Sequence, residues 1–451
     1  MDDRRPTSLH PECPDVARLG PTPADGAVRA LAERVAADAE TRTDVWRHGF
    51  SRRRFLAGLG ATGVAALGSQ LVTARASYGQ PGATGTLVVV FLRGGLDGLS
   101  AIVPAGDPHL AAARPRIAVP AGALLPLDRG FGLHPALAPL HQLWARGQFT
   151  AVPAVSTPDL SRSHFQAQDC LERGGSSTGA TEGWLDRVLD HLGPGTTFRS
   201  LAVGNTTPRS LVGDQAALAF RGVEGFKLGV GEGEFAIRTA QALASLYTGL
   251  DHPMAVDAAM TLDGLAITAR VAATDAPPGV AYPDGQLGDR LGELARLIKS
   301  DVGVRVACVD VGGWDMHTNL GTLDGGAMKQ QLTSLGSTLG AFAQDLGPRL
   351  DQVTVVVMTE FGRRVEQNAN AGTDHGHGAA VMLLGGGLAG GTIHGNWQDL
   401  APDALDHGDV PGWNDYRDVL SEVVAGRLGL GADALAAVFP DHRAQPVGVM
   451  A

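Results

Sequence analysis

Cysteine is scarce in this chain: among 451 residues only Cys13, Cys170 and Cys308 occur. If residues 1–76 form a leader that is removed, as argued below, Cys13 leaves with it and at most one disulfide remains possible. Cys170 and Cys308 could pair in an oxidising compartment. We expect instead that both are buried free thiols, because free cysteine behaves as a small hydrophobic residue.

The sequence also lacks long hydrophobic runs and an excess of basic residues. No stretch after residue 76 reaches the ~18 apolar residues of a membrane span, which argues against a permanent membrane segment. The formal net charge is −11, and removal of residues 1–76, with 11 basic and 9 acidic side chains, leaves −13. This balance argues against nucleic acid or an anionic membrane surface as partner. A dinucleotide fingerprint is missing as well, since Gly385-Gly386-Gly387 lacks the required spacing and acidic partner.

A pattern typical of the twin-arginine export signal is present. Residues 51–57 read Ser-Arg-Arg-Arg-Phe-Leu-Ala, with the arginine pair at Arg52 and Arg53. A weakly apolar, Gly/Ala-rich stretch follows at 56–72 and ends at the small-x-small site 74–76, which suits signal peptidase. The alternative is a basic surface turn before a core helix. We expect a partner in the twin-arginine translocation machinery, which exports folded proteins, and a location in the periplasm, the cell envelope or outside the cell.

The remaining pattern predicts an α/β domain over residues 86–451, after a leader at 1–76 and a linker at 77–85. Continuous apolar runs, typical of strands that are covered on both faces, occur at 86–92, 149–155, 304–311, 353–358 and 380–384. Helical periodicity of apolar residues appears at 287–298, 332–346 and 416–428. Strand–helix–strand order predicts a mostly parallel central sheet flanked by helices. Residues 205–285 fit this rhythm poorly and are expected to form an insertion or cap.

Acidic and imidazole side chains follow several of these apolar runs. In open α/β sheets, sites gather at the carboxyl ends of strands. Such groups suit a divalent cation, and the candidate ligands are Asp97, Asp315, His317, Asp374, His375 and His377. Asp97 could instead be a turn former or helix cap, and Asp315 with His317 could form a simple turn. We expect Glu360 to face solvent or pair with Arg363 or Arg364, with a role as a metal ligand as the alternative.

A second candidate group lies after the run at 149–155, in Ser161-Arg162-Ser163-His164-Phe165. Ser163, or Ser161, at the start of a helix could be a cap. It could also be a nucleophile, activated by a metal and with Arg162 nearby to stabilise developing charge. His134 and His394 are single histidines, which we expect to be structural.

Five motifs together resemble the bacterial family called "domain of unknown function 1501", in which a twin-arginine leader is typical. They are VVVFLRGGLDGL, SRSHF, GGWDMH, TEFGRR and GTDHGHG, and they span Leu87 to about Leu400. That family is similar to the alkaline phosphatase and sulfatase superfamily. The resemblance implies an alkaline-phosphatase-like fold and a site for one or two divalent ions (Zn, Mn, Ca or Mg).

Individual residues match motif positions of that superfamily. Asp97 resembles the aspartate after its first strand, and Ser163 (or Ser161) resembles its nucleophile. Asp374 and His375 resemble the Asp-His-Gly pair that would complete one metal site with Asp97. Asp315 and His317 resemble the ligands of the other site, which His377 or His394 could complete. Two departures stand out: only Met316 separates Asp315 from His317, and no Cys-x-Pro-x-Arg sulfatase motif occurs.

The sequence thus predicts an exported metal-dependent hydrolase of phosphate or sulfate esters, with a small anionic ester as substrate. An alternative from another class is a catalytically degenerate protein of the same fold that acts in envelope binding or assembly, or in carbohydrate binding. A third, weaker alternative is a partner of an oxidoreductase, for which the export route is the only support.

Overall fold

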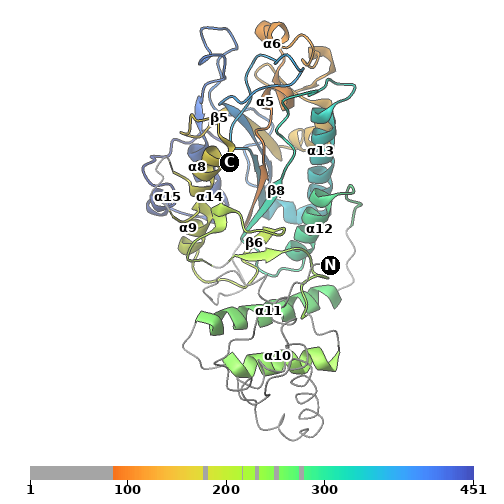
Figure 1. Cartoon of the computed structure of the whole chain (residues 1–451), viewed down its shortest axis with the longest axis vertical. Coiled ribbons are helices and arrows are strands. Elements are labelled where there is room, and N and C mark those ends of the chain that lie inside the picture. The colour runs from red at the N-terminus through yellow and green to blue at the C-terminus, as the bar shows by residue number, and fades with distance from the viewer. Residues whose placement is uncertain (1–84, 176–180, 216, 229–232, 248–252, 274–278) are drawn as a thin grey trace, which may run out of the picture. The chain divides into compact units, whose positions relative to one another are not determined.

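The computed structural model describes residues 85–175, 181–215, 217–228, 233–247, 253–273 and 279–451 (Figure 1). The predicted leader (1–76) and nearly all of the predicted linker (77–85) lie outside these residues. Within the described part of the chain, no helix has both the length and the apolar character needed to cross a membrane.

An eight-stranded sheet forms the centre of the domain, with strand order β11-β5-β10-β9-β1-β8-β6-β7. Every pairing is parallel except those of β10, which runs antiparallel to both of its neighbours. The strands are β1 (Thr86–Leu92), β5 (Phe149–Ser156), β6 (Ser200–Val203), β7 (Leu218–Phe220), β8 (Val306–Val311), β9 (Val353–Met358), β10 (Ala379–Gly385) and β11 (Asn414–Asp415). A small antiparallel sheet contains β2 (Ile102–Pro104), β3 (Leu125–Pro126) and β4 (Phe131–Leu133).

Helices cover both faces of the central sheet (Figure 1). One face packs against α7 (Ala138–Trp144), α12 (Gln286–Lys299) and α13 (Ala327–Leu346), and the other against α9 (Trp184–His191), α14 (Tyr416–Leu428) and α15 (Ala432–Val438). In β1, Val88 and Val90 belong to the first core and Leu87 and Val89 to the second. Alternate side chains of a strand point to opposite faces, so a central strand must be apolar throughout. The predicted mostly parallel sheet flanked by helices is confirmed.

The remaining helices are short or lie in the region predicted as an insertion. They are α5 (Gly98–Ala101), α6 (Pro108–Ala113), α8 (His164–Arg173), α10 (Glu234–Tyr247) and α11 (Pro253–Ala273). The chain divides into two compact units, and within 205–285 only Lys227–Leu262 falls outside the unit that contains the sheet. Before this segment, β7 pairs with β6 in the central sheet. After it, Ile267 and Val271 are part of the core.

The antiparallel direction of β10 determines which loops meet. The carboxyl ends of β1, β5, β8 and β9 lie at one edge of the sheet, and the amino end of β10 lies at the same edge. Residues after the parallel strands therefore approach residues before β10. Asp374, His375 and His377 precede β10 in the sequence, so the reversed strand brings them to the edge where the other candidate ligands lie.

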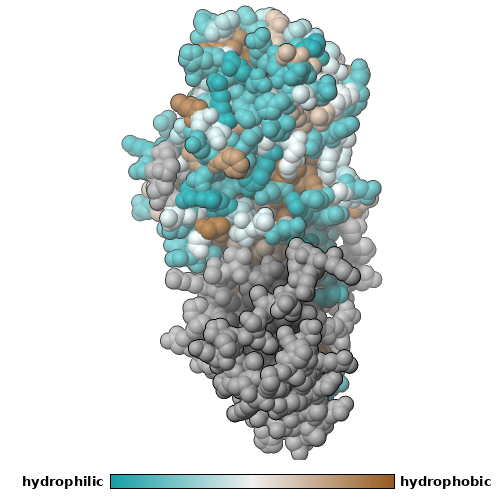
Figure 2. All heavy atoms as spheres, in the orientation of Figure 1, coloured by the Kyte–Doolittle hydropathy of each residue, from teal (hydrophilic) through white to brown (hydrophobic). Residues whose placement is uncertain are grey.

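The described surface is mostly hydrophilic on the face shown in Figure 2, with apolar residues in small, separate patches. Of the described residues, the large hydrophobic side chains that are exposed are Leu160, Phe165, Val212, Phe235 and Ile237. Cys170 and Cys308 are free thiols, as predicted, but only Cys308 is buried; Cys170 is partly exposed.

Candidate metal centre

His164 is the first residue of α8 and directs one imidazole nitrogen into a cluster of potential ligands. Its Nδ1 lies 2.7 Å from the Oε1 of Glu360. Because the carboxylate can only accept, Nδ1 donates the hydrogen and Nε2 carries a lone pair. This Nε2 is buried without a hydrogen-bond partner, 3.6 Å from the Oδ2 of Asp315. An imidazole oriented by a carboxylate through its other nitrogen is a common arrangement in metal sites.

Asp315 is the carboxylate at the middle of this cluster. Its neighbours Trp314 and Met316 are buried, so the extended segment after β8 presents Asp315 and His317 together on its open side. Burial raises the pKa of the Asp315 carboxyl, but the Arg363 guanidinium, with His375 and His317, outweighs this effect and lowers it to about 2. The carboxylate is therefore ionised at neutral pH and available to a cation.

His375 and His317 direct their Nε2 atoms to the same carboxylate. The His375 Nδ1 donates to the backbone carbonyl of Arg162 at 2.9 Å, and its Nε2 lies 3.2 Å from the Oδ1 of Asp315. The His317 Nδ1 lies 3.2 Å from the Oδ1 of Asp374, and its Nε2 lies 2.9 Å from the Oδ1 of Asp315. Each of these two rings, like His164, thus has an acceptor at Nδ1 and Asp315 at Nε2.

His317 and His375 face each other through nitrogen atoms that can share a proton or a cation. Their Nε2 atoms are 2.9 Å apart, and in neutral rings whose Nδ1 atoms donate, both Nε2 atoms present lone pairs. Two facing lone pairs repel unless a proton or a metal ion lies between them. Metal–nitrogen bonds of about 2.0–2.1 Å allow one ion to bind both atoms. His164, Asp315 and His375 each offer one ligand atom, and these three atoms lie within 4.8 Å of one another.

Glu360 was predicted to face solvent or pair with an arginine, and this was wrong. The side chain is 1% exposed, and its Oε1 accepts hydrogen bonds from His164, the backbone N–H of Gly94 at 2.9 Å and the Gln168 Nε2 at 2.9 Å. Burial raises its pKa, but hydrogen bonds, among them those from Gln168 and His164, lower it on balance. Glu360 is the second residue after β9, and its side chain extends into the loops rather than outward.

Arg363 joins the loops that carry the ligands. Its guanidinium is 1% exposed and donates to Asp315 Oδ1 at 2.7 Å. It also donates to backbone carbonyls of Gly94, Gly95, Trp314 and Thr373, which belong to the loops after β1 and β8 and before β10. A planar guanidinium with five N–H donors can hold several acceptors in fixed positions. The position of Asp315 is therefore fixed from inside the protein.

Asp97 lies apart from the described cluster, in a buried ion pair. Its Oδ2 and Oδ1 accept from Arg114 at 2.5 and 3.0 Å, and Ser100 Oγ donates to Oδ2 at 2.5 Å. Both side chains of the pair are almost fully buried, at 1% and 2% exposure. Asp97 precedes α5 as its N-cap residue, although its side chain makes no cap hydrogen bond. The carboxylate that the resemblance assigned to a metal is thus neutralised by an arginine.

The other predicted residues lie around the cluster. Asp374 supports His317 and accepts a hydrogen bond from the Asn368 Nδ2 at 3.0 Å, and these two contacts lower its pKa. Ser163 is the N-cap residue of α8, yet its side chain makes no cap hydrogen bond. The Arg162 guanidinium pairs with the buried Asp409 at 2.6 Å. His377 is outside the group of clustered ligand atoms, and burial lowers its pKa.

His164 is the residue that the sequence analysis did not assign as a ligand. The signal was present, because this histidine directly follows Ser163 at the start of α8, after the loop that leaves β5. It was read as part of a nucleophile motif, and only the tertiary contact with Glu360 shows where its ring points. His134 and His394 are structural, as expected: His134 Nδ1 caps a short helix by accepting from Ala136, and the His394 Nε2 bonds the carbonyl of Ala389.

Comparison with known proteins identifies a family and some distant structural neighbours. Solved structures that align include the PsFucS1 sulfatase from Pseudoalteromonas sp. (11% identity, TM-score 0.33, 79% of this chain and 70% of that one). Another is Ps i-CgsB in complex with k-i-k-neocarrahexaose (10% identity, TM-score 0.33, 78% and 74%). At these TM-scores the alignments carry no argument about activity. No curated protein matches the sequence.

A family model described as "Protein of unknown function (DUF1501)" matches residues 144–411, more than half of the chain. The matched segment includes His164, Asp315, His317, Glu360 and His375, and so contains every residue of the cluster described above. The chain therefore belongs to the DUF1501 family.

Proposed function

We propose that this protein is an exported hydrolase of phosphate or sulfate esters that depends on one divalent metal ion. The observation that supports the proposal is the convergence of three imidazole Nε2 atoms on the Asp315 carboxylate. Each imidazole is oriented by an acceptor at Nδ1: Glu360, Asp374 or the carbonyl of Arg162. Export rests on the twin-arginine pattern at 51–57.

The ligands that would hold the ion are His164, Asp315, His317 and His375. Three nitrogens and one carboxylate oxygen fit Zn²⁺ or another transition ion better than Ca²⁺ or Mg²⁺, which prefer oxygen ligands. The buried, unpartnered Nε2 of His164 fits such an ion, because an imidazole nitrogen enclosed without a hydrogen bond is costly unless something binds it. Among the described residues a second ion finds no comparable set, since Asp97 is bound by Arg114.

When bound, a divalent ion lowers the pKa of an adjacent hydroxyl or water and neutralises anionic oxygens. Ser163 is the proposed nucleophile: it directly precedes His164, and its Oγ is not engaged as a helix cap. The Oγ would lose its proton and form a bond to phosphorus or sulfur, while the ester oxygen leaves as the protonated alcohol. Water would then cleave the serine ester and release free phosphate or sulfate.

Arg162 acts through its backbone in this proposal. Its carbonyl holds the His375 ring, and its guanidinium is occupied by Asp409. The positive φ of +55° at Arg162 is a strained conformation for a residue with a side chain, and it places this carbonyl in a loop immediately before α8. We therefore assign Arg162 to positioning rather than to stabilising charge on the substrate.

The test combines metal analysis with ester hydrolysis. The purified protein should contain about one transition-metal ion per chain, and His164→Ala and His375→Ala should lose it. His394→Ala is the matched control, because that imidazole bonds a backbone carbonyl and should keep the metal. Hydrolysis of 4-nitrophenyl phosphate and 4-nitrophenyl sulfate should depend on the metal and fall by at least about 10³-fold in Ser163→Ala.

The outcomes separate the proposal from its rival. A metal-free protein with all four ligands intact would overturn the metal centre. Turnover that is unchanged in Ser163→Ala would remove the serine and leave water as the nucleophile. A tightly bound metal without turnover of any phosphate or sulfate ester would favour the catalytically degenerate binding or assembly protein.

A further inference from the structure

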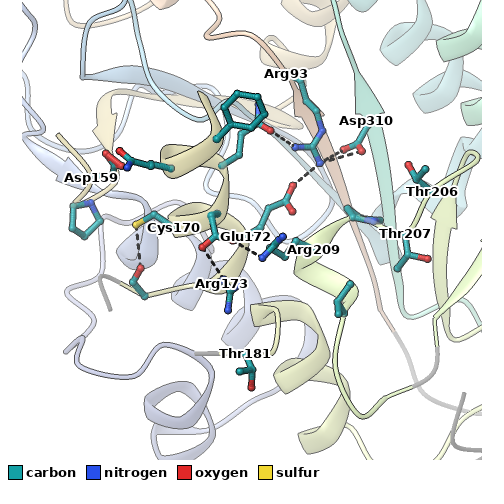
Figure 3. Close-up of a pocket in the computed structure, with 18 residues that line it drawn as sticks. Arg93, Asp159, Cys170, Glu172, Arg173, Thr181, Thr206, Thr207, Arg209 and Asp310 are labelled. Atoms are coloured by element: carbon teal, nitrogen blue, oxygen red, sulfur yellow. Dashed lines mark hydrogen bonds and ion pairs between the residues drawn. The ribbon is translucent and has the colours of Figure 1, made fainter. Parts of the chain in front are cut away.

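A cavity of about 1060 Å³ (Figure 3) is lined in part by helix α8, which also carries the candidate ligand His164. Within this helix, His164 belongs to the candidate metal centre, and the next residue, Phe165, lines the cavity. Gln168, one turn later, also lines the cavity and donates to Glu360, the carboxylate that orients His164. The side chain of Gln168 thus connects the wall of the cavity to Glu360, which positions the candidate ligand His164.

The charged groups of the cavity wall neutralise one another. Arg93 pairs with Glu172 at 2.5 Å and with Asp310 at 3.0 Å, and these three residues form part of the wall. Asp169 pairs in turn with Arg173 and Arg209, both at 2.8 Å. Figure 3 shows these ion pairs as dashed lines along the cavity. Because the arginines are already engaged, the wall offers no excess of positive charge to a polyanion.

The wall combines apolar and polar surface. Its apolar residues include Phe165 and Val212, which are 88% and 45% exposed, so the Phe165 ring gains almost nothing from folding. The hydroxyls of Thr181, Thr206 and Thr207 and the carboxylate of Asp159 are among the wall's polar groups. One exposed aromatic ring next to many hydrogen-bonding groups matches the two surfaces of a sugar ring. The C–H face of a sugar stacks on the negative face of an aromatic ring, while its hydroxyls bond to paired carboxylates, guanidinium groups and hydroxyls.

We propose that this cavity binds an uncharged, polyhydroxylated group such as a sugar ring, and that this group is the alcohol part of the ester whose anionic end reaches the metal centre. The inference rests on the proposed function for the second half of this statement only. Sugar binding itself requires the cavity and Phe165, not hydrolysis. The generic nitrophenyl esters would then be hydrolysed less efficiently than sugar esters, because their ring has no hydroxyls for the hydrogen-bonding groups of the wall.

The experiment measures sugar binding separately from turnover. The probes are the methyl glycosides of glucose, galactose and N-acetylglucosamine, detected by saturation-transfer NMR on the full chain. At least one should bind, Phe165→Ala should weaken it by about fivefold or more, and Phe165→Trp should retain it. Phe235→Ala is the matched control, because Phe235 is also exposed, at 59%, and lies on α10 in the other compact unit.

The results distinguish the two proposals. Binding that needs an aromatic residue at 165, with no hydrolysis of any ester, supports the sugar site and overturns the hydrolase. Hydrolysis of nitrophenyl esters without binding of any glycoside overturns the sugar site alone. Equal binding by Phe165→Ala and the unaltered protein also overturns it. If the sugar site and the hydrolase are both supported, glucose 6-sulfate or glucose 6-phosphate should be cleaved with a kcat/KM higher than that of the matching nitrophenyl ester. Phe165→Ala should reduce this difference.

Discussion

Replacing Glu360 by Gln tests whether this carboxylate serves the metal centre. The substitution keeps the shape of the side chain and one oxygen that can accept hydrogen bonds. It removes the negative charge that now faces the His164 Nδ1 at 2.7 Å in a site that is 1% exposed. With Gln, the bond to Nδ1 is no longer assisted by charge, and an amide rotated by half a turn would present N–H to N–H. The ring of His164 then loses its fixed tautomer and orientation.

The magnitude follows from comparable sites. Removing the partner of a metal-binding histidine costs about 10–100-fold in metal affinity, which corresponds to about 1.4–2.7 kcal/mol. Hydrogen bonds to charged groups contribute about 1.5–3 kcal/mol each, so loss of this one bond accounts for the whole range. We expect Glu360→Gln to bind Zn²⁺ about 10–100-fold more weakly, with a similar circular dichroism spectrum.

The assay is competition for Zn²⁺ against a chromophoric chelator at fixed pH and ionic strength. Asp345→Asn is the matched control: Asp345 is also a buried carboxylate, bound by Lys299 at 2.6 Å and by Tyr282 at 3.1 Å, and it contacts none of the candidate ligands. This control should lose stability but retain Zn²⁺ affinity. An affinity of Glu360→Gln within about twofold of the unaltered protein would refute the role of Glu360 in orienting His164.

Three further predictions follow from the same contacts. Asp97→Asn should lower the free energy of unfolding by about 3–5 kcal/mol, because it leaves Arg114 buried without its charge partner. Denaturant titration checks this, and the metal content should stay unchanged; loss of the metal would show that Asp97 is a ligand after all. Arg363→Met should lower both the free energy of unfolding and the Zn²⁺ affinity, because Asp315 and four backbone carbonyls lose their donor. Calorimetry with and without Zn²⁺ measures the two effects. An unchanged affinity would contradict the positioning role of Arg363. Chelation of the metal should lower the midpoint of thermal unfolding, because an ion at 100 times its Kd stabilises the native state by about 2.7 kcal/mol. A midpoint that stays the same with chelator and with added Zn²⁺ would argue against a bound ion.

Much of the fold could be predicted because the signal is local. The buried runs at 86–92 and 353–358 coincide with β1 and β9, and the periodicity at 416–428 coincides with α14. Strands covered on both faces and helices with one apolar face leave these patterns wherever they lie in the domain. The direction of β10 leaves no such pattern. Its run at 380–384 looks like those of the parallel strands, and only the pairing with β5 and β9 shows that it is reversed.

The site was harder to predict because its geometry depends on contacts between distant residues. Asp315, His317 and His375 were identified from residue type and position after or before a strand, and the structure brings them together. Asp97 satisfied the same criteria, yet Arg114, 17 residues further along the chain, occupies its carboxylate. Nothing in the spacing of the two residues indicates that pair. Glu360 shows the opposite case, in which an apparently ordinary acidic residue is buried because its acceptors are needed by His164 and Gly94.

The same contacts bear on the number of ions. The resemblance to the superfamily implied two sites, one built on Asp97 with Asp374 and His375, and the other on Asp315 and His317. In the structure, His375 and His317 both point their Nε2 atoms at Asp315 and lie 2.9 Å apart. Nitrogen atoms this close can bind the same ion, because metal–nitrogen bonds are about 2.0–2.1 Å long. Asp374 orients His317 through Nδ1, a role that supports a ligand rather than adding one. We therefore propose one ion, held by the ligands of both expected sites together with the nitrogen of His164. A single ion with one adjacent serine can activate a nucleophile, but it leaves the departing alcohol without a second ion. In this proposal the alcohol is recognised by protein groups, for which the cavity along α8 is our candidate.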